Sequence, residues 1–156
     1  MASRPGPPAT PAPPPHPTPA VAQAPLAIGP AAVGRYAAEI VRVIDGDTFE
    51  ARVQVWPNMA LTTRVRLRGI DAPELKARCA DERVRADAAL EGLRALLAEA
   101  DVTVAAIGPD KYFGRVVADV ATRNTPSVSA ALLEKGLARR YSGGHRDGWC
   151  DVKVAG

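Results

Sequence analysis

The sequence predicts a mainly β domain: a five-stranded OB-type barrel with one long and one short helix packed against it. The first observation is the alternation of apolar and polar residues in three segments before residue 71 and two after residue 100, typical of strands with one buried face. The second is that each group is followed by apolar residues at three- and four-residue spacing, the period of an amphipathic helix. Three strands, a helix, two strands and a closing helix are the order of an OB-fold, and five strands are too few for a sandwich.

The first two strands are predicted at residues 36–44 and 49–55, on either side of Asp45-Gly46-Asp47-Thr48. An Asp-Gly step between two apolar runs is a strong hairpin signal, so this segment is expected to form the turn. Residues 56–61 contain a proline and an asparagine and are expected to form a loop before the third strand, at residues 62–70.

The third strand carries apolar residues on one face and basic residues on the other. Val65 and Leu67 alternate with Arg64, Arg66 and Arg68, and side chains along a strand point to opposite faces in turn. Three guanidinium groups are therefore expected to line one surface.

An acidic segment follows this strand. Gly69 and Pro73 break the strand, so Asp71 and Glu74 are expected at its turn, close to the arginines. If this segment meets the acidic turn at residues 45–48, the two together form an oxygen-rich pocket for a hard cation, beside arginines suited to phosphate.

The second half of the domain begins with the long helix. Asp81 is the predicted N-cap, and the helix is expected to run to about Ala100. Strands are then predicted at residues 101–107 and from 113 or 114 to 120, joined by a turn at residues 108–110. The short helix is predicted at residues 127–135 and is expected to stop at Gly136, a common residue after a helix C-cap.

The first 35 residues have a different composition and are predicted to be disordered. They hold 11 of the 15 prolines, no acidic residue and no periodic apolar pattern, so they cannot bury enough surface to offset the entropy of ordering. The domain is therefore assigned to residues 36–156. Two of the three net positive charges belong to this tail, so net charge alone says little about nucleic acid, and the placement of the arginines matters more.

No apolar run approaches the roughly 20 residues that a membrane-spanning helix needs, which excludes a transmembrane segment. Ala20-Val21-Ala22 before Gln23 is similar to a signal-peptidase site, but no apolar region precedes it. The tail is thus either a degenerate targeting segment or a coincidence of alanine-rich composition. We expect a secreted or periplasmic protein rather than a cytoplasmic one, and a monomer.

The chain has two cysteines, Cys79 and Cys150, whose spacing lacks the character of a zinc site. They form either one disulfide or two unrelated thiols. In an exported protein the disulfide would tie the C-terminal tail to the loop beside the acidic segment.

Four motifs, in order and in register, resemble the staphylococcal nuclease (thermonuclease-like) family. They read V-I-D-G-D-T at residues 43–48, R-L-R-G-I-D-A-P-E at 66–74, D-K-Y-F-G-R at 110–115 and E-K-G-L-A at 134–138. The resemblance covers about residues 36–142. It implies an OB-type barrel and calcium-dependent hydrolysis of phosphodiester bonds in DNA and RNA.

The resemblance also implies roles for individual residues. It places Ca²⁺ on Asp47, Asp71 and the backbone carbonyl of Ala72, which leaves coordination positions open for a substrate phosphate. It gives the orientation or activation of the attacking water to Glu74. The two arginines that contact phosphate in the family correspond to Arg66 and Arg115.

Three further residues are substrate-binding candidates by the same resemblance. Lys111 and Tyr112 would lie near a terminal phosphate of the substrate, and Tyr141 is the candidate for a base-stacking tyrosine. The chain departs from the family pattern at Phe113, which is inserted between Tyr112 and Gly114.

Each motif taken alone has a simpler interpretation. Asp47 can be an ordinary hairpin aspartate, Arg64 and Arg68 a solvated strand face, and Arg115 one end of an ion pair with Asp119 or Glu74. The aromatic residues can be packing groups.

The combined motifs predict an endonuclease with little sequence specificity, acting on single-stranded or unpaired DNA and RNA. The rival prediction is an OB-fold module that binds nucleic acid or another partner without cleaving it. The presence together of both arginines, both aspartates and Glu74 favours the enzyme.

Overall fold

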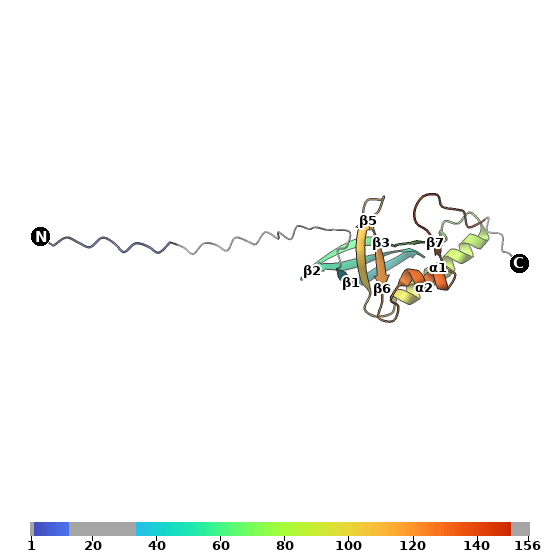
Figure 1. Cartoon of the computed structure of the whole chain (residues 1–156), viewed down its shortest axis with the longest axis horizontal. Helices are drawn as coiled ribbons and strands as arrows, with labels where there is room; N and C mark the ends of the chain where they lie inside the picture. Colours follow the sequence, from blue (N-terminus) through green and yellow to red (C-terminus); the bar gives the residue numbers. More distant parts are fainter. Residues whose placement is uncertain (1, 13–33, 151–156) are drawn as a thin grey trace.

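A computed structural model describes residues 2–12 and 34–150 (Figure 1). Residues 2–12, in the tail predicted to be disordered, are exposed and contain no helix or strand. Residues 13–33 of that tail, which include the Ala20-Val21-Ala22 segment, lie outside the described residues. Arg35, the last residue of the predicted tail, instead begins the first strand of the barrel. No helix within the described ranges is both long and apolar enough to cross a membrane.

Five strands close into a barrel, as the sequence predicts (Figure 1). Their order around the barrel is β1-β2-β3-β6-β5, and β1 closes the barrel against β5. The pair β3–β6 is parallel, and the other pairs are antiparallel. The strands are β1 (Arg35–Asp45), β2 (Thr48–Trp56), β3 (Met59–Leu67), β5 (Thr103–Pro109) and β6 (Arg115–Ala121).

The loop predicted at residues 56–61 is shorter than expected. Trp56 pairs with Met59, so Pro57 and Asn58 alone make the connection and β3 begins at Met59. Asn58 has a φ of 62°, a left-handed conformation that asparagine tolerates better than most residues, which permits the tight turn.

The third strand also ends earlier than predicted, at Leu67. Gly69 turns the chain with a φ of 82°, a conformation that favours glycine. The next two residues form β4 (Ile70–Asp71), which pairs with β7 (Arg139–Arg140) in a small separate sheet. This pairing joins the acidic segment to the C-terminal part of the chain.

Two helices pack beside the barrel and contact each other (Figure 1). α1 (Ala80–Leu97) begins after Cys79, because the sulfur of Cys79 accepts a hydrogen bond from the backbone N–H of Glu82. The prediction of Asp81 as N-cap was therefore wrong, and the helix ends short of Ala100. α2 (Val128–Glu134) has Ser127 as its N-cap and ends before Gly136, whose φ is 70°, as predicted.

The core fixes the position of the acidic hairpin turn against α1. Phe49, Leu67 and Leu93 are fully buried where the barrel meets the helix. A Cβ atom on Gly46 would lie 2.5 Å from the Cβ of Ala89 and 2.9 Å from that of Ala72. The turn therefore packs directly against the helix, and only glycine fits there without a shift.

Candidate active site

The hairpin turn holds Asp47 in a fixed, buried orientation. The residue as a whole is 6% exposed. Its Oδ1 accepts a hydrogen bond from the Thr48 hydroxyl at 2.8 Å, and its Oδ2 accepts one from the backbone N–H of Ala72 at 3.0 Å. The second bond links the two acidic segments directly, so Asp47 lies against the backbone of Ala72, the residue after Asp71.

Asp71 lies on β4, is 1% exposed, and accepts hydrogen bonds from two guanidinium groups. Arg139 donates to Oδ2 at 3.2 Å, and Arg146 donates to Oδ1. Burying a carboxylate is costly unless it is paired, and these two arginines supply the pairing.

Arg146 also reaches Glu74, which connects the buried and exposed carboxylates. Its Nη1 lies 3.2 Å from Oε1 of Glu74, whose side chain is 58% exposed. Burial acts to lower the pKa of Arg146, but the hydrogen bond to Asp71 and the negative charges of Asp71, Asp47 and Glu74 outweigh it and raise the pKa. The guanidinium thus lies in the field of all three carboxylates.

The oxygen donors here fit a hard divalent cation. Burial, and after it the negative charge of the nearby Asp47, together raise the pKa of Asp45 to about 7. Neighbouring carboxylates supply the oxygen donors that Ca²⁺ prefers, and a cation bound to them would relieve their mutual repulsion.

Arg66 lies on β3 at the border of this acidic cluster. Its Nη2 donates to the backbone carbonyl of Ile70 at 3.0 Å and lies 3.9 Å from Oδ2 of Asp47. Its guanidinium also lies over the ring of Tyr141, 5.5 Å from the centroid. These contacts hold Arg66 beside the carboxylates.

Arg115 begins β6 and pairs with Asp110. The alternative pairings with Asp119 or Glu74 are therefore wrong. Arg115 also lies over the ring of Tyr112, 4.6 Å from the centroid. Burial acts to raise the pKa of Asp110, but hydrogen bonds from Arg115 and from the backbone N–H of Lys111 outweigh it and lower the pKa.

A cavity of about 580 Å³ joins the two arginines and the candidate substrate-binding residues. Its lining is mostly basic and aromatic. Among the lining residues are Arg66, Lys111, Tyr112, Arg115, Tyr141 and Arg146. Arg146 also lines a second cavity of about 240 Å³, together with Asp71 and Glu74. Basic groups beside acidic groups in this arrangement suit a phosphate bound next to a cation.

Of the remaining residues, Arg64 is exposed, as predicted for a solvated strand face. Arg68 is different: it donates to the carbonyls of Ala106 and Val117 and pairs with Asp119 at 3.2 Å. It therefore connects β5 and β6, and the prediction that it is merely solvated was wrong. Phe113 is fully exposed and does not pack in the core.

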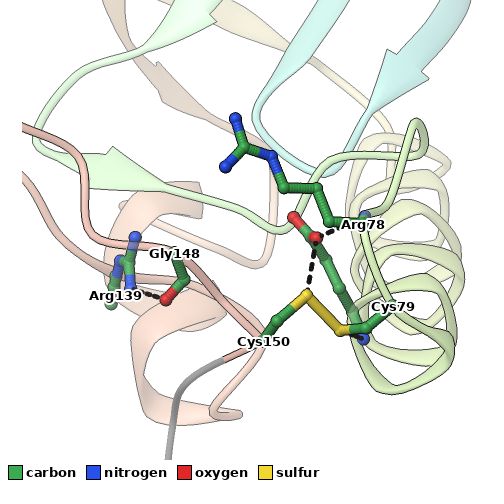
Figure 2. The surroundings of a disulfide bond; sticks show 6 residues. Arg78, Cys79, Arg139, Gly148 and Cys150 are labelled. Atoms are coloured by element: carbon green, nitrogen blue, oxygen red, sulfur yellow. Dashed lines mark hydrogen bonds between the residues drawn. A yellow bond between two sulfur atoms is a disulfide. The ribbon is translucent and has the colours of Figure 1, made fainter.

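Cys79 and Cys150 form a disulfide, which decides between the two alternatives left open by the sequence (Figure 2). It attaches the C-terminal loop, defined here as residues 141–150, to the start of α1. Arg139 donates a hydrogen bond to the Gly148 carbonyl at 3.5 Å and stacks on Trp149 at 4.3 Å. These contacts fold the C-terminal loop back over Asp71.

Sequence reasoning missed Arg139, Arg146 and Asp110 as members of the site. Arg139 follows the last family motif directly, and Arg146 precedes a cysteine by four residues in a glycine-rich stretch. A disulfide to Cys79 would have indicated that this stretch returns to the acidic segment, but the pairing could not be decided from the sequence.

The model of the family described as staphylococcal nuclease homologues matches residues 64–148, more than half of the chain. The chain belongs to the staphylococcal nuclease family. The matched residues include Arg66, Asp71, Glu74 and Arg115, and membership of the family supports a nuclease function.

Two proteins of known name are similar to this chain. Protein ParB of Escherichia coli is 33% identical over 129 residues, which are 78% of this chain and 67% of the relative. Endonuclease YhcR of Bacillus subtilis (strain 168) is 29% identical over 119 residues, 72% of this chain but 9% of that relative. The similarity to YhcR therefore concerns a small part of a much longer protein.

Proposed function

We propose that the protein is a calcium-dependent endonuclease that hydrolyses phosphodiester bonds in DNA and RNA. The observation that carries this proposal is the hydrogen bond between Asp47 and the N–H of Ala72, which joins two buried acidic segments at the edge of a basic cavity. Family membership and the similarity to a protein named as an endonuclease support the reaction class.

In this proposal Asp47, Asp71 and the carbonyl of Ala72 hold Ca²⁺. Bound there, the cation would act as a Lewis acid that polarises a phosphate oxygen. Glu74 is exposed enough to meet a water molecule, which it would orient or deprotonate for attack on phosphorus.

Arg66 and Arg115 would stabilise the charge that develops on the non-bridging oxygens. A guanidinium suits this role because its planar fork donates two parallel hydrogen bonds to a phosphate. Both side chains line the same cavity, which supports a shared phosphate group as their partner.

The substrate would be single-stranded or unpaired. Tyr112 and Tyr141 line the cavity with their rings beside arginines, and exposed bases stack on such rings without regard to sequence. Lys111 adds a positive charge for a further phosphate. We propose that the protein is a monomer. We also propose a secreted or periplasmic location, and the disulfide supports this location because such bonds persist in oxidising compartments.

The test is cleavage of a labelled single-stranded oligonucleotide by the full chain, in calcium and in chelator. We expect cleavage in calcium only, and Glu74→Gln should lower the rate at least about a hundredfold. Calcium should still raise the melting temperature of this variant, because Glu74 is not a proposed ligand. Asp87→Asn, which removes an exposed carboxylate of α1, is the matched control. Cleavage that persists in chelator would overturn the calcium assignment.

The alternative is a non-catalytic OB-fold module. The basic and aromatic cavity would serve such a module equally well for binding. Oligonucleotide binding by the wild type without cleavage, in calcium, would decide for this alternative.

A further inference from the structure

The C-terminal loop places Arg146 where the proposed calcium ligand and the proposed water-orienting residue meet. Its guanidinium pairs with Asp71 through one nitrogen and with Glu74 through the other, 3.2 Å from Oε1. The roles implied by the four sequence motifs include neither of these contacts. A single guanidinium therefore pairs with both carboxylates at once.

The position of Arg146 is fixed from both sides of the loop. Tyr141 precedes it, and its backbone N–H bonds to the Gly69 carbonyl at 3.0 Å while its ring lies 5.9 Å from the Arg146 guanidinium. Cys150 follows it and is bonded to Cys79 at the start of α1 (Figure 2). Between them, Gly143 and Gly144 have φ values of 100° and 86°, which let the chain reverse.

Arg146 also borders both cavities, the acidic one with Asp71 and Glu74 and the basic one with Arg66 and Arg115. A rotation of its long side chain would carry the guanidinium from one to the other without movement of the backbone. In the basic cavity its partner would be an anion, and the planar fork matches a phosphate.

We propose that Arg146 is a third substrate-binding arginine, which pairs with Asp71 and Glu74 in the free protein and with a substrate phosphate once a cation binds. The inference rests on the proposed function. A cation on Asp71 competes with the guanidinium for the same carboxylate and repels it. A phosphate beside that cation offers the released guanidinium a new partner of opposite charge.

This proposal requires opposite effects on two affinities. Removing Arg146 removes a competitor of the cation, so calcium should bind more tightly in the absence of nucleotide. It also removes a phosphate contact, so nucleotide should bind more weakly when calcium is saturating. A residue that only supports the fold of the loop would weaken both affinities together.

The experiment measures calorimetrically the binding of calcium alone, then of a nucleoside 3′,5′-bisphosphate in saturating calcium. The bisphosphate carries phosphate groups but no diester bond, so cleavage plays no part. For Arg146→Ala we expect calcium affinity to rise and bisphosphate affinity to fall, each by about tenfold, the scale of one charge-assisted hydrogen bond. Arg146→Lys keeps the charge and should leave calcium affinity within about threefold of wild type, while bisphosphate affinity still falls.

Arg140→Ala is the matched control, because it removes an exposed arginine of the neighbouring strand β7 and the same unit of charge. We expect both affinities of this variant to stay within about twofold of wild type, as for an exposed charge screened by salt. Thermal melts identify any variant that fails to fold. If Arg146→Ala fails to fold, the two affinities of Arg146→Lys provide the test.

The outcomes separate the inference from the proposed function. If the wild type binds neither calcium nor the bisphosphate, the proposed function itself fails. If the wild type binds both and Arg146→Ala lowers both affinities, or changes neither, the calcium and phosphate sites of the proposed function stand and the role of Arg146 is overturned.

Discussion

Asp71 is a nearly inaccessible carboxylate that meets two guanidinium groups, from Arg139 and Arg146. The chain separates these residues from Asp71 by 68 and 75 positions. A buried carboxylate without a partner would cost several kcal/mol, so the acidic segment depends on the C-terminal part of the chain for its charge balance.

Asp110 positions Arg115, and the two residues should therefore differ in their effect on catalysis. Arg115→Ala should lower turnover at least about a hundredfold, because a guanidinium aimed at the developing charge stabilises the transition state more than the bound substrate. Arg66→Ala should behave similarly. Asp110→Asn should lower turnover only about tenfold, because the guanidinium remains and its orientation alone is loosened.

The measurement is paired: steady-state cleavage, and equilibrium binding of the bisphosphate in calcium. Binding should stay within about fivefold of wild type for each arginine variant, and Arg→Lys should restore little turnover. Equal losses of binding and turnover in both arginine variants would instead indicate a binding module.

At the residue scale the sequence was sufficient for the acidic segments and insufficient for their partners. Asp47, Asp71 and Glu74 stand in short motifs with turn residues on either side, so local chemistry predicts the turns, although Asp71 itself lies on β4. Arg146 stands in a glycine-rich stretch without periodicity, and its position depends on the disulfide and on β7. No local pattern encodes a contact of that kind.

At the scale of elements, the sequence pattern predicts the long strands β1–β3 but not the two-residue strands β4 and β7. The long strands alternate apolar and polar residues and are therefore visible in the sequence. Ile70–Asp71 and Arg139–Arg140 are two residues each, too short for alternation, and they are strands only because they pair with each other. Cys79 was missed as an N-cap because sulfur is a weak acceptor that helix starts rarely use.

Gly46→Ala tests whether the hairpin turn and α1 form one packed unit. The added methyl would overlap the Cβ of Ala89 at 2.5 Å, so the turn must move and carry Asp47 with it. We expect a loss of roughly 1–3 kcal/mol in the free energy of unfolding, the usual cost of overpacking. The stabilisation that calcium provides should shrink as well, because a displaced ligand binds the cation less well.

The control is the double variant Gly46→Ala with Ala89→Gly, which removes the opposing methyl group. It should recover part of the calcium-induced rise in melting temperature, because the contact of the added methyl group with the Cβ of Ala72 at 2.9 Å remains and glycine in the helix costs about 1 kcal/mol by itself. If Gly46→Ala alone kept the full calcium effect, the turn would not need this close packing to hold Asp47 in place.

At the scale of the whole molecule, barrel closure brings together the strands that carry the two arginines proposed to bind phosphate. Arg66 and Arg115 lie on β3 and β6, which form the parallel pair of the barrel, with Arg64 opposite Arg115 and Arg66 opposite Val117. The strand pattern predicted that these segments belong to one barrel, but the register between them follows only from the closed structure. The C-terminal loop then completes the site from outside the barrel.

The disulfide holds the C-terminal loop at the site by a covalent bond. Its removal should affect both the stability of the protein and the site. It joins residues 71 positions apart, for which the chain-entropy model gives a stabilisation of roughly 4 kcal/mol. The double variant Cys79→Ser, Cys150→Ser puts a hydroxyl oxygen in place of the sulfur acceptor at the N-cap of α1. The loss of stability should therefore come from the cross-link rather than from the helix start. Urea unfolding should show a lower free energy of unfolding for this variant, and for the wild type in reductant, while reductant should leave the variant unchanged.

Removal of the disulfide should also change the affinity for calcium. Because the C-terminal loop is then held at one end only, Arg146 meets Asp71 at a lower effective concentration, and calcium should bind the variant more tightly than it binds the oxidised wild type. Identical unfolding midpoints for oxidised and reduced wild type would contradict the disulfide, and unchanged calcium affinity would contradict its role in holding Arg146 at the site.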